Sequence, residues 1–395
     1  MMYSFATAVN RKNTDSIKYD FAGRMGYPAD ILPLWVADMD FPSPPEVLGA
    51  LETRVRHGIF GYSDDAGPEY FGALSAWYRE RFGWELSPEW LVKTPGVVFA
   101  VSAAIRALTR EGASVLIQPP VYYPFARLIS ENGRKPAVNP LVYKDGRYSI
   151  DFSDFEEKIR QNRVKLFILC SPHNPVGRVW RQEELAAMGE ICLKYNVPVV
   201  SDEIHADFVS PGRRHRVFAS LRPEFSDLTV TCTAPTKTFN LAGLQISNIL
   251  ISNGELRDRF RHEVERTGCG LPNAMGLVAC RAAYAHGGPW LEELKAYLLS
   301  NLSFVRQFLS ERLPRVRLVE PEGTYLIWLD CRELGLSDCE LKERILYKAG
   351  LWLDDGPMFG PGGAGFQRMN IACPRAVLKE AMERLAGAFS GLPES

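Results

Sequence analysis

The sequence lacks the cysteine spacing that marks a zinc site or a disulfide scaffold. Its 395 residues include eight cysteines, and none of them forms a C-x-x-C pair. Zinc ribbons and redox motifs use such pairs, and small secreted domains use closely spaced cysteines as disulfides. Several of these cysteines lie inside apolar runs, where a free thiol behaves as a small hydrophobic side chain. We therefore expect reduced, mostly buried thiols in a cytoplasmic protein.

Long apolar runs and an excess of charge of one sign are also missing. No run reaches the roughly 18 apolar residues of a membrane-spanning helix, and residues 1–20 hold no stretch that resembles a signal peptide. Lysine and arginine together number 46, against 47 aspartates and glutamates. Nucleic acids and anionic membranes bind clustered positive charge, so neither is an expected partner. Small molecules are the expected ligands.

The sequence does contain short apolar, β-branched runs that alternate with segments of helical periodicity. The segment 182–195, for example, places Leu185, Met188 and Cys192 on one face of a helix. Runs of this kind are typical of buried parallel strands, and they occupy residues 114–118, 164–170, 197–201, 228–233 and 247–251. The alternation predicts an α/β fold with a mostly parallel sheet between helices.

The pattern changes near residue 288 and predicts a second, smaller unit. The elements expected there are a helix over 289–313, strands over 316–319 and 324–330, and a closing helix over 374–389. The proline-rich start of the chain is irregular and is expected to wrap across the body of the protein. We therefore expect an N-terminal wrapping segment (1–45), a large α/β domain (46–287) and a small α+β domain (288–395).

Polar side chains follow the ends of four predicted strands. Asn174 lies in S-P-H-N-P-V-G, Asp202 in S-D-E-I-H, Lys237 in P-T-K-T-F-N and Tyr122 in P-P-V-Y. Ligands of open α/β sheets bind at the carboxyl ends of the strands, so these side chains are expected around one crevice. An amide, a carboxylate, an amine and an aromatic ring suit a planar, charged aromatic cofactor.

These motifs, in this order, resemble the aspartate-aminotransferase-like (fold type I) pyridoxal-phosphate enzymes of the class I and II aminotransferase superfamily. The resemblance covers nearly the whole chain. It implies that Lys237 binds the cofactor aldehyde and then removes the substrate Cα proton. It also implies that Asp202 pairs with the pyridinium nitrogen and that Tyr122 stacks on the ring. Asn174 would donate to the phenolic oxygen of the cofactor and approach the substrate carboxylate.

The same resemblance assigns the remaining site residues. Arg368, in F-Q-R-M-N, would hold the substrate α-carboxylate with its planar fork of donors. The cofactor phosphate would bind backbone amides of Gly96, Val97 and Val98 at a helix N-terminus, with the Thr236 hydroxyl beside them. Tyr62 resembles the tyrosine that this family sends to the active site of the neighbouring subunit. The resemblance therefore implies a homodimer with shared active sites.

Two departures from ordinary aminotransferases point to one branch of this family. Gln245 stands where aminotransferases usually have a phosphate-binding arginine, and Ala234 stands where they usually have a serine. The segments K-T-F-N-L-A-G-L-Q (237–245) and W-V-A-D-M-D-F (35–41) look like the cystathionine β-lyase-like C–S lyases of the MalY/PatB type. That likeness implies β-elimination of L-cystathionine or another cysteine S-conjugate to a thiol, pyruvate and ammonia.

Two other functions remain open at this point. An aminotransferase that acts on an L-amino acid would use the same residues, because both reactions begin with removal of the Cα proton. A non-catalytic regulatory or interaction protein on this scaffold is disfavoured, since Lys237 and Asp202 are both present.

Two further patterns are weaker signals. The glycines of 360–365 match G-x-G-x-x-G, but no predicted strand precedes them and 366–372 looks extended, so a dinucleotide site is not expected. A group of possible metal ligands lacks a second histidine pair, and we expect no metal there; it consists of Asp202, Glu203, His205, Asp207 and His215. His205 stands where many aminotransferases have a tyrosine.

Overall fold

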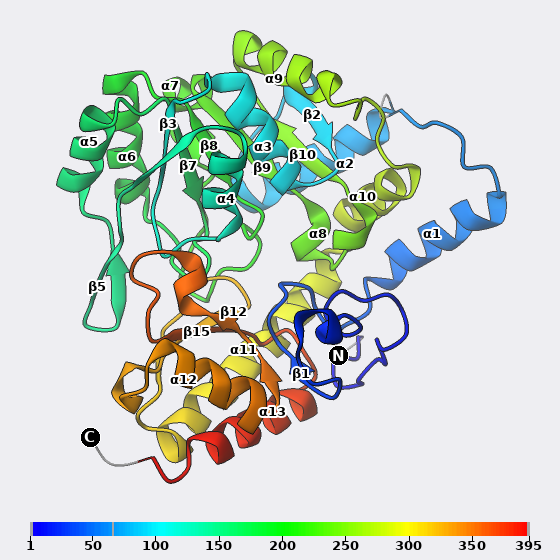
Figure 1. The fold of residues 1–395 in the computed structure, drawn as a ribbon. Helices are drawn as coiled ribbons and strands as arrows, with labels where there is room; N and C mark the ends of the chain where they lie inside the picture. The colour runs from blue at the N-terminus through cyan, green and yellow to red at the C-terminus, as the bar shows by residue number, and fades with distance from the viewer. Residues whose placement is uncertain (1–2, 65–66, 393–395) are drawn as a thin grey trace.

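A central sheet covered by helices makes up the upper part of the molecule, and a smaller sheet with its own helices lies below it (Figure 1). The structure is a computed structural model that describes residues 3–64 and 67–392. Within these ranges seven strands form the central sheet in the order β2-β10-β9-β8-β7-β3-β4. Their bounds are β2 (Leu91–Thr94), β3 (Ser114–Ile117), β4 (Lys135–Val138), β7 (Leu166–Cys170), β8 (Val199–Asp202), β9 (Thr229–Thr233) and β10 (Ser247–Leu250).

The five strands from β9 to β4 are parallel, as the sequence predicts, but β10 is not. It pairs in the antiparallel direction with both β9 and β2. The prediction that 247–251 is a parallel strand is therefore wrong in direction. All four residues of β10 are buried, and a strand buried on both faces shows the same apolar run in either direction.

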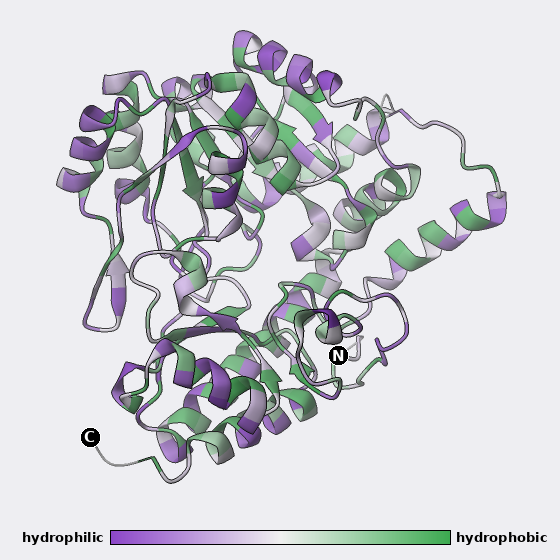
Figure 2. Cartoon of the chain, in the orientation of Figure 1, coloured by the Kyte–Doolittle hydropathy of each residue, from purple (hydrophilic) through white to green (hydrophobic). Residues whose placement is uncertain are grey.

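Helices cover both faces of this sheet, and successive strand residues contact opposite layers. In β7, Leu166 and Ile168 pack into one cluster, whereas Phe167 and Leu169 pack into another. Figure 2 shows hydrophobic residues along the central strands and mixed residues along the outer helices. The helices of this part are α2 (Pro68–Phe82), α3 (Val97–Leu108), α4 (Pro124–Glu131), α5 (Phe152–Gln161), α6 (Gln182–Tyr195), α7 (Pro223–Asp227), α8 (Pro235–Thr238), α9 (Gly254–Arg266) and α10 (Ala274–His286).

The second sheet is antiparallel and has the order β11-β12-β15-β14. The predicted elements after residue 288 are confirmed to within two residues at their ends. They are α11 (Gly288–Arg312), β11 (Arg317–Val319), β12 (Leu326–Asp330) and α13 (Arg375–Phe389), together with α12 (Asp338–Glu343), β14 (Asp354–Asp355) and β15 (Phe366–Asn370). The glycines of 360–365 form the loop before β15, after the 3-10 turn η7 (Gly356–Phe359), so the structure gives them no preceding strand of the dinucleotide-binding kind.

The N-terminal residues run along the junction between the two sheets (Figure 1). They hold the turn η1 (Ala22–Met25) and the two-residue strand β1 (Leu32–Pro33), before α1 (Pro45–His57) begins. Strand β1 pairs in parallel with β13 (Leu351–Trp352), which follows the π-helical turn η6 (Arg344–Lys348). An isolated hairpin of β5 (Val142–Lys144) and β6 (Arg147–Ser149) completes the fold. The division of the chain at residues 45 and 287 stays a prediction.

Among the described helices, none combines the length and the apolar character that a membrane crossing requires.

Candidate active site

Asp202 and Lys237 lie at the same edge of the central sheet. Asp202 is the last residue of β8 and pairs in register with Cys170 and Cys232 of the flanking strands. Lys237 follows β9 in the single turn of α8. Because β7, β8 and β9 are parallel, their carboxyl ends place these polar residues around one point.

The Asp202 carboxyl is buried and weakly solvated. It is 6% exposed, and its Oδ1 accepts a hydrogen bond from the Ile204 amide at 3.2 Å. Burial raises the pKa of the Asp202 carboxyl to about 7, and the positive charge of Lys237 offsets only part of that effect. A cation that donates a hydrogen bond to this carboxyl would stabilise its charged form.

The Lys237 amine is also taken out of water. Its Nζ donates a hydrogen bond to the Ala37 carbonyl oxygen at 2.7 Å. Burial lowers the pKa of the amine to about 8, and the positive charge of Arg368 acts in the same direction. Asp38 and Asp202 act in the opposite direction. The amine can therefore lose its proton near neutral pH, which a nucleophile or a general base requires.

Arg368 reaches the same place from the second sheet. It lies in β15, is 3% exposed, and forms an ion pair with Asp354 of the adjacent strand β14. Its Nη1 donates to Asn174 Oδ1 at 3.0 Å, and its Nη2 donates to the Trp35 carbonyl oxygen at 2.8 Å. The Nε of Arg368 is buried and has no hydrogen-bond partner among the described residues. A buried donor without a partner is costly, so this face of the guanidinium is suited to a bound carboxylate.

Tyr122 lies in the loop that follows β3. Burial raises the pKa of the Tyr122 phenol, and the charges of Asp202 and Arg368 act on that pKa in opposite directions. The phenol is therefore close enough to both charged groups for each of them to change its pKa. The aromatic ring packs against Tyr123 and Phe125, with centroids 5.6 and 5.5 Å away.

The start of α3 and the start of α8 lie at neighbouring strand ends, since β2 and β9 both flank β10. Gly96 precedes the first turn of α3, and a Cβ atom built on it would meet no heavy atom within 4 Å. The space beside the Gly96 Cα is therefore open, and helix N-termini attract anions. Val97 is buried and Val98 is exposed, while Thr236 is buried beside Lys237.

Tyr62 is the one predicted site residue that the chain does not bring to this point. It is 96% exposed and lies on the segment between α1 and α2, which extends away from the rest of the molecule (Figure 1). Ile59 and Phe60 on the same segment are 66% and 59% exposed. Such a run of exposed apolar side chains is unusual on a monomer surface and typical of an interface.

The possible metal ligands next to Asp202 have structural contacts instead. Glu203 accepts hydrogen bonds from Ser201 and the Phe218 amide and contacts His215 Nε2 at 2.7 Å. Asp207 accepts from Thr238 Oγ1 at 2.7 Å and from Trp77 Nε1. These carboxylates are thus engaged within the fold.

His205 faces the site as a neutral ring. Burial and the positive charges of Lys237 and Arg368 lower its pKa to about 3. Its Nδ1 finds no hydrogen-bond partner within the described part of the chain, and its ring lies against Tyr325 at 5.9 Å. Gln245, at the position of the usual phosphate-binding arginine, is exposed and has a positive φ of 50°.

Sequence reasoning missed the contribution of the backbone at 35–38. The carbonyl oxygens of Trp35 and Ala37 accept from Arg368 and Lys237, and that of Ala37 also accepts from the Tyr325 hydroxyl at 3.0 Å. Asn370 Nδ2 donates to the carbonyls of Val36 and Asp38 at 2.7 and 2.6 Å. The segment therefore links the two sheets across the site. The motif W-V-A-D-M-D-F marked this segment, but every residue has a carbonyl, so side-chain types did not reveal the contacts.

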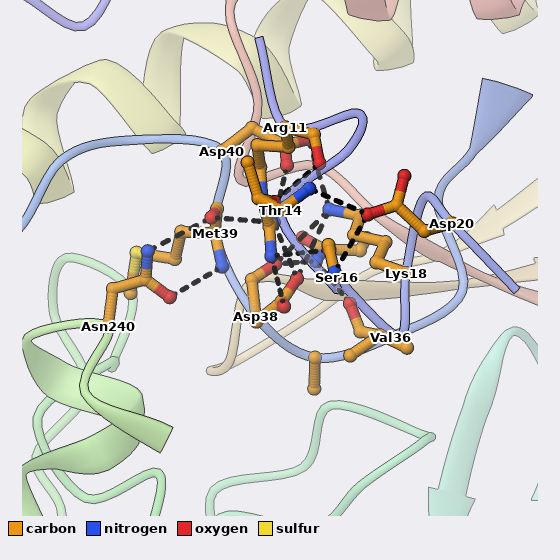
Figure 3. A network of polar contacts seen from close by, with 12 residues as sticks. Arg11, Thr14, Ser16, Lys18, Asp20, Val36, Asp38, Met39, Asp40 and Asn240 are labelled. Carbon is orange, nitrogen blue, oxygen red and sulfur yellow. Dashed lines mark hydrogen bonds and ion pairs between the residues drawn. The ribbon is translucent and has the colours of Figure 1, made fainter. Parts of the chain in front are cut away.

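A partly buried ionic network holds that segment in place (Figure 3). Arg11 donates to both Asp38 and Asp40, and Lys18, which is 1% exposed, pairs with Asp40 at 3.0 Å. Asn240 Oδ1 accepts from the Met39 amide at 2.9 Å. Two cations and two carboxylates balance one another here, so the wrapping N-terminal residues position the carbonyls that contact Lys237 and Arg368.

The residues present fit pyridoxal phosphate. The buried Asp202 carboxyl lacks the cationic donor that a pyridinium nitrogen would supply, and a perturbed amine lies beside it. Tyr122 offers an aromatic face, and the start of α3 offers amides for a phosphate.

Comparison with known proteins agrees with this geometry. The aminotransferase class I and II family matches residues 29–385. Cystathionine beta-lyase PatB of Bacillus subtilis (strain 168) is 46% identical over 387 residues, which are 98% of this chain and 100% of the relative. Cystalysin of Treponema denticola, solved with pyridoxal 5'-phosphate, has a TM-score of 0.95 and 39% identity, with 100% of each chain covered. The pyridoxal-phosphate-bound C–S lyase of Staphylococcus hominis has a TM-score of 0.92 and 33% identity, with 98% of each chain covered.

Because these alignments cover 98% or more of this chain, the structural similarity extends over both of its sheets. The chain belongs to the class I and II aminotransferase family of pyridoxal-phosphate enzymes and, within that family, to the group of the cystathionine β-lyases.

Proposed function

We propose that this protein is a pyridoxal-phosphate-dependent carbon–sulfur β-lyase that cleaves L-cystathionine or other cysteine S-conjugates. One observation carries the proposal: the Lys237 amine and the buried Asp202 carboxyl lie at the ends of the adjacent parallel strands β9 and β8, and each charge acts on the pKa of the other. The guanidinium of Arg368 also acts on the pKa of Lys237. Relatives named cystathionine beta-lyase and C–S lyase support the same reaction.

Each residue of the site has a defined task in holding the cofactor. Asp202 would accept the hydrogen bond of the pyridinium nitrogen and keep it protonated. Tyr122 would pack against the ring, and the side-chain amide of Asn174 would donate to the phenolic oxygen. The amides of 96–98 and the Thr236 hydroxyl would bind the phosphate. When bound, pyridoxal phosphate supplies an electron-withdrawing ring that stabilises negative charge at the substrate Cα.

The chain's own groups also handle the substrate. Arg368 binds the α-carboxylate through its unpartnered Nε and one Nη, while Asp354 and Trp35 fix the plane of the guanidinium. Lys237 removes the Cα proton. The electron pair of the Cα–H bond then forms the Cα–Cβ double bond, and the Cβ–S bond breaks with its electron pair on sulfur.

The reaction balances without an oxidant or a reductant. The thiolate that leaves takes up a proton and departs as a thiol. The released 2-aminoacrylate reacts with one water molecule to give pyruvate and ammonia. An S-substituted cysteine and water are thus consumed, and a thiol, pyruvate and ammonia are formed.

A pyruvate assay tests the proposal. The holoenzyme is expected to form pyruvate from L-cystathionine or S-methyl-L-cysteine at the same rate with and without 2-oxoglutarate. A strict requirement for the keto acid would identify an aminotransferase instead. If neither pyruvate nor a new amino acid were formed, the proposed lyase function would be wrong.

The active enzyme is proposed to be a cytoplasmic homodimer. The exposed segment that contains Ile59, Phe60 and Tyr62 supports an interface with a second copy, because it offers apolar side chains that its own chain does not cover. All eight cysteines are free thiols, six of them buried, which suits a reducing compartment.

Replacement of Tyr62 by phenylalanine is expected to weaken cofactor binding. If the tyrosine reaches the phosphate in the partner subunit, the change removes one hydroxyl donor from a charged acceptor. The cofactor Kd should then rise by about one to two powers of ten. Titration of the apoenzyme with pyridoxal phosphate measures it, and Tyr347→Phe, at an exposed tyrosine of the second sheet layer, is the matched control.

Mixed dimers give the sharper test. A dimer of one Tyr62→Phe subunit and one Lys237→Ala subunit has one site with both defects and one site with neither. At limiting cofactor, activity should rise above that of either parent. No recovery in a sample shown to contain mixed dimers would mean that Tyr62 does not act across the interface.

Cofactor capture is expected to depend on pH through Lys237. The amine must be neutral to react with the aldehyde, and its pKa is about 8. Below that pH each unit lowers the neutral fraction about tenfold, so capture at pH 6 should be about 100-fold slower than at pH 9. Stopped-flow absorbance of the apoenzyme mixed with pyridoxal phosphate measures the rate. A rate that kept rising up to pH 10.5 would indicate an unperturbed lysine.

A further inference from the structure

A cavity of about 430 Å³ lies beside the site, between the wrapping N-terminal residues and the segment 342–358. Tyr27 and Trp35 line it from the N-terminal side, and Trp352 and Met358 line it from the second sheet layer. Tyr123, from the loop after β3, lines it as well. The cavity is therefore built where three parts of the chain meet.

Aromatic rings dominate its wall. The rings of Trp35 and Trp352 are stacked, with centroids 4.4 Å apart and planes 12° apart. Tyr27 meets Trp352 edge to face at 5.0 Å. The pairing of β1 with β13 holds the two indoles together, because Leu34 and Trp352 are joined through the Leu34 amide at 2.9 Å. The wall is thus rigid as well as apolar, and Ile345 adds an aliphatic surface.

The cavity adjoins the carboxylate-binding arginine. Asp354, which lines it, forms the ion pair with Arg368. The backbone of Trp35 accepts from the same guanidinium at 2.8 Å. Tyr123 directly follows Tyr122. A substrate whose carboxylate lies on Arg368 therefore has this cavity within reach of the rest of its side chain.

Three of the four charged groups that line the cavity have ion-pair partners. Lys342 Nζ lies 3.1 Å from Asp355 Oδ2, and Asp354 is held by Arg368. Arg24 is exposed at the rim and lies over the Phe21 ring at 4.1 Å. The indole Nε1 of Trp35 is buried and has no hydrogen-bond partner among the described residues, so it could donate to one acceptor of a bound group. The ammonium of L-cystathionine would meet carboxylates that are already paired and would lose more water contacts than it regains. An apolar group carries no such desolvation cost.

We infer that this cavity binds the sulfur-borne group of the substrate and selects apolar, above all aromatic, thioethers over L-cystathionine. The inference rests on the proposed lyase function and narrows its substrate class. With S-benzyl-L-cysteine as the example, the Cβ–S bond breaks, phenylmethanethiolate leaves with the electron pair and takes up a proton, and the other atoms leave as pyruvate and ammonia after addition of water.

The wild-type holoenzyme tests the selectivity directly. Its kcat/KM is measured by pyruvate release from S-benzyl-L-cysteine, S-methyl-L-cysteine and L-cystathionine. The benzyl compound is expected to exceed each of the others by at least about tenfold, chiefly through a lower KM, because each added carbon gains apolar contact. Equal values, or a preference for L-cystathionine, would overturn the inference.

A set of variants locates the effect in the cavity. Trp352→Ala should lower the ratio of benzyl to methyl kcat/KM by about tenfold, and Trp352→Phe by less, because an aromatic face is retained. Tyr347→Ala removes an aromatic ring that is 60% exposed and lies outside the cavity, so the ratio should stay constant. If Trp352→Ala does not fold, Met358→Glu serves in its place, because it puts a charge at the half-exposed rim of the cavity. It should also lower the ratio of benzyl to methyl kcat/KM. If none of these variants changes that ratio, the cavity does not bind the sulfur-borne group.

Binding of the product thiol adds a readout that is independent of turnover. Phenylmethanethiol is titrated into wild type and Trp352→Phe by calorimetry, and the variant is expected to bind several-fold more weakly. Equal affinity would count against the cavity. Absence of pyruvate from every thioether would instead refute the lyase function itself, so the two failures are distinguishable.

Discussion

Lys237→Ala is expected to abolish pyruvate formation, with a loss of at least about 10⁴-fold in kcat. The reason is that one amine has two tasks: it holds the cofactor and it removes the Cα proton. Lys237 is suited to both, because burial lowers its pKa to about 8 and the carbonyl of Ala37 orients it. The measurement is a coupled pyruvate assay together with borohydride reduction and mapping of the labelled peptide.

The control is Lys165→Ala, which removes an exposed lysine at the start of the buried segment that forms β7. It should keep both the label and the activity. A borohydride-stable cofactor label that persists in Lys237→Ala, together with pyruvate release, would show that another lysine performs the chemistry.

Arg368→Ala has the second largest expected effect. A bidentate, charge-assisted contact to a desolvated carboxylate is lost, so substrate binding should weaken by about 3 kcal/mol, or somewhat more than 100-fold in KM. Cofactor affinity should change little, because the proposed cofactor contacts come from other residues. Steady-state kinetics with S-methyl-L-cysteine and a cofactor titration separate the two.

Loss of Arg368 is also expected to lower the stability of the fold, so the variant needs a control for stability. Without Arg368 the buried Asp354 carboxyl loses its partner, and breaking a buried ion pair costs about 3–5 kcal/mol of stability. The variant is therefore studied beside Arg368→Ala combined with Asp354→Asn, which removes the unpaired charge. Arg368→Lys keeps the charge but not the fork of donors. If KM stayed at the wild-type value in the folded double variant, another group would bind the carboxylate.

Much of the fold could be predicted because local patterns decide it. The helix over 182–195 was predicted with its observed bounds, since apolar residues recur at helical spacing. The buried strands were predicted from their β-branched runs. The direction of β10 could not be, because strand direction depends on how the connection returns to the sheet and leaves no trace in a fully buried run.

Some residues of the candidate site could be predicted from the sequence, and others could not. Asn174, Asp202 and Lys237 were expected together because each follows a strand, and Arg368 and Tyr62 came from the family resemblance. Asp354 was not expected, although it is the ion-pair partner of Arg368. Its sequence context, a pair of aspartates after an apolar run, resembles an ordinary loop.

The sequence by itself determined which chemical groups follow the strands, and hence the family and the cofactor. Tertiary structure alone decided how those groups behave. The pKa values of Asp202 and Lys237 move toward neutrality because distant segments exclude water from them, and desolvation depends on all surrounding atoms. The same holds for the aromatic cavity beside Arg368, whose walls come from residues more than 300 positions apart, such as Trp35 and Trp352.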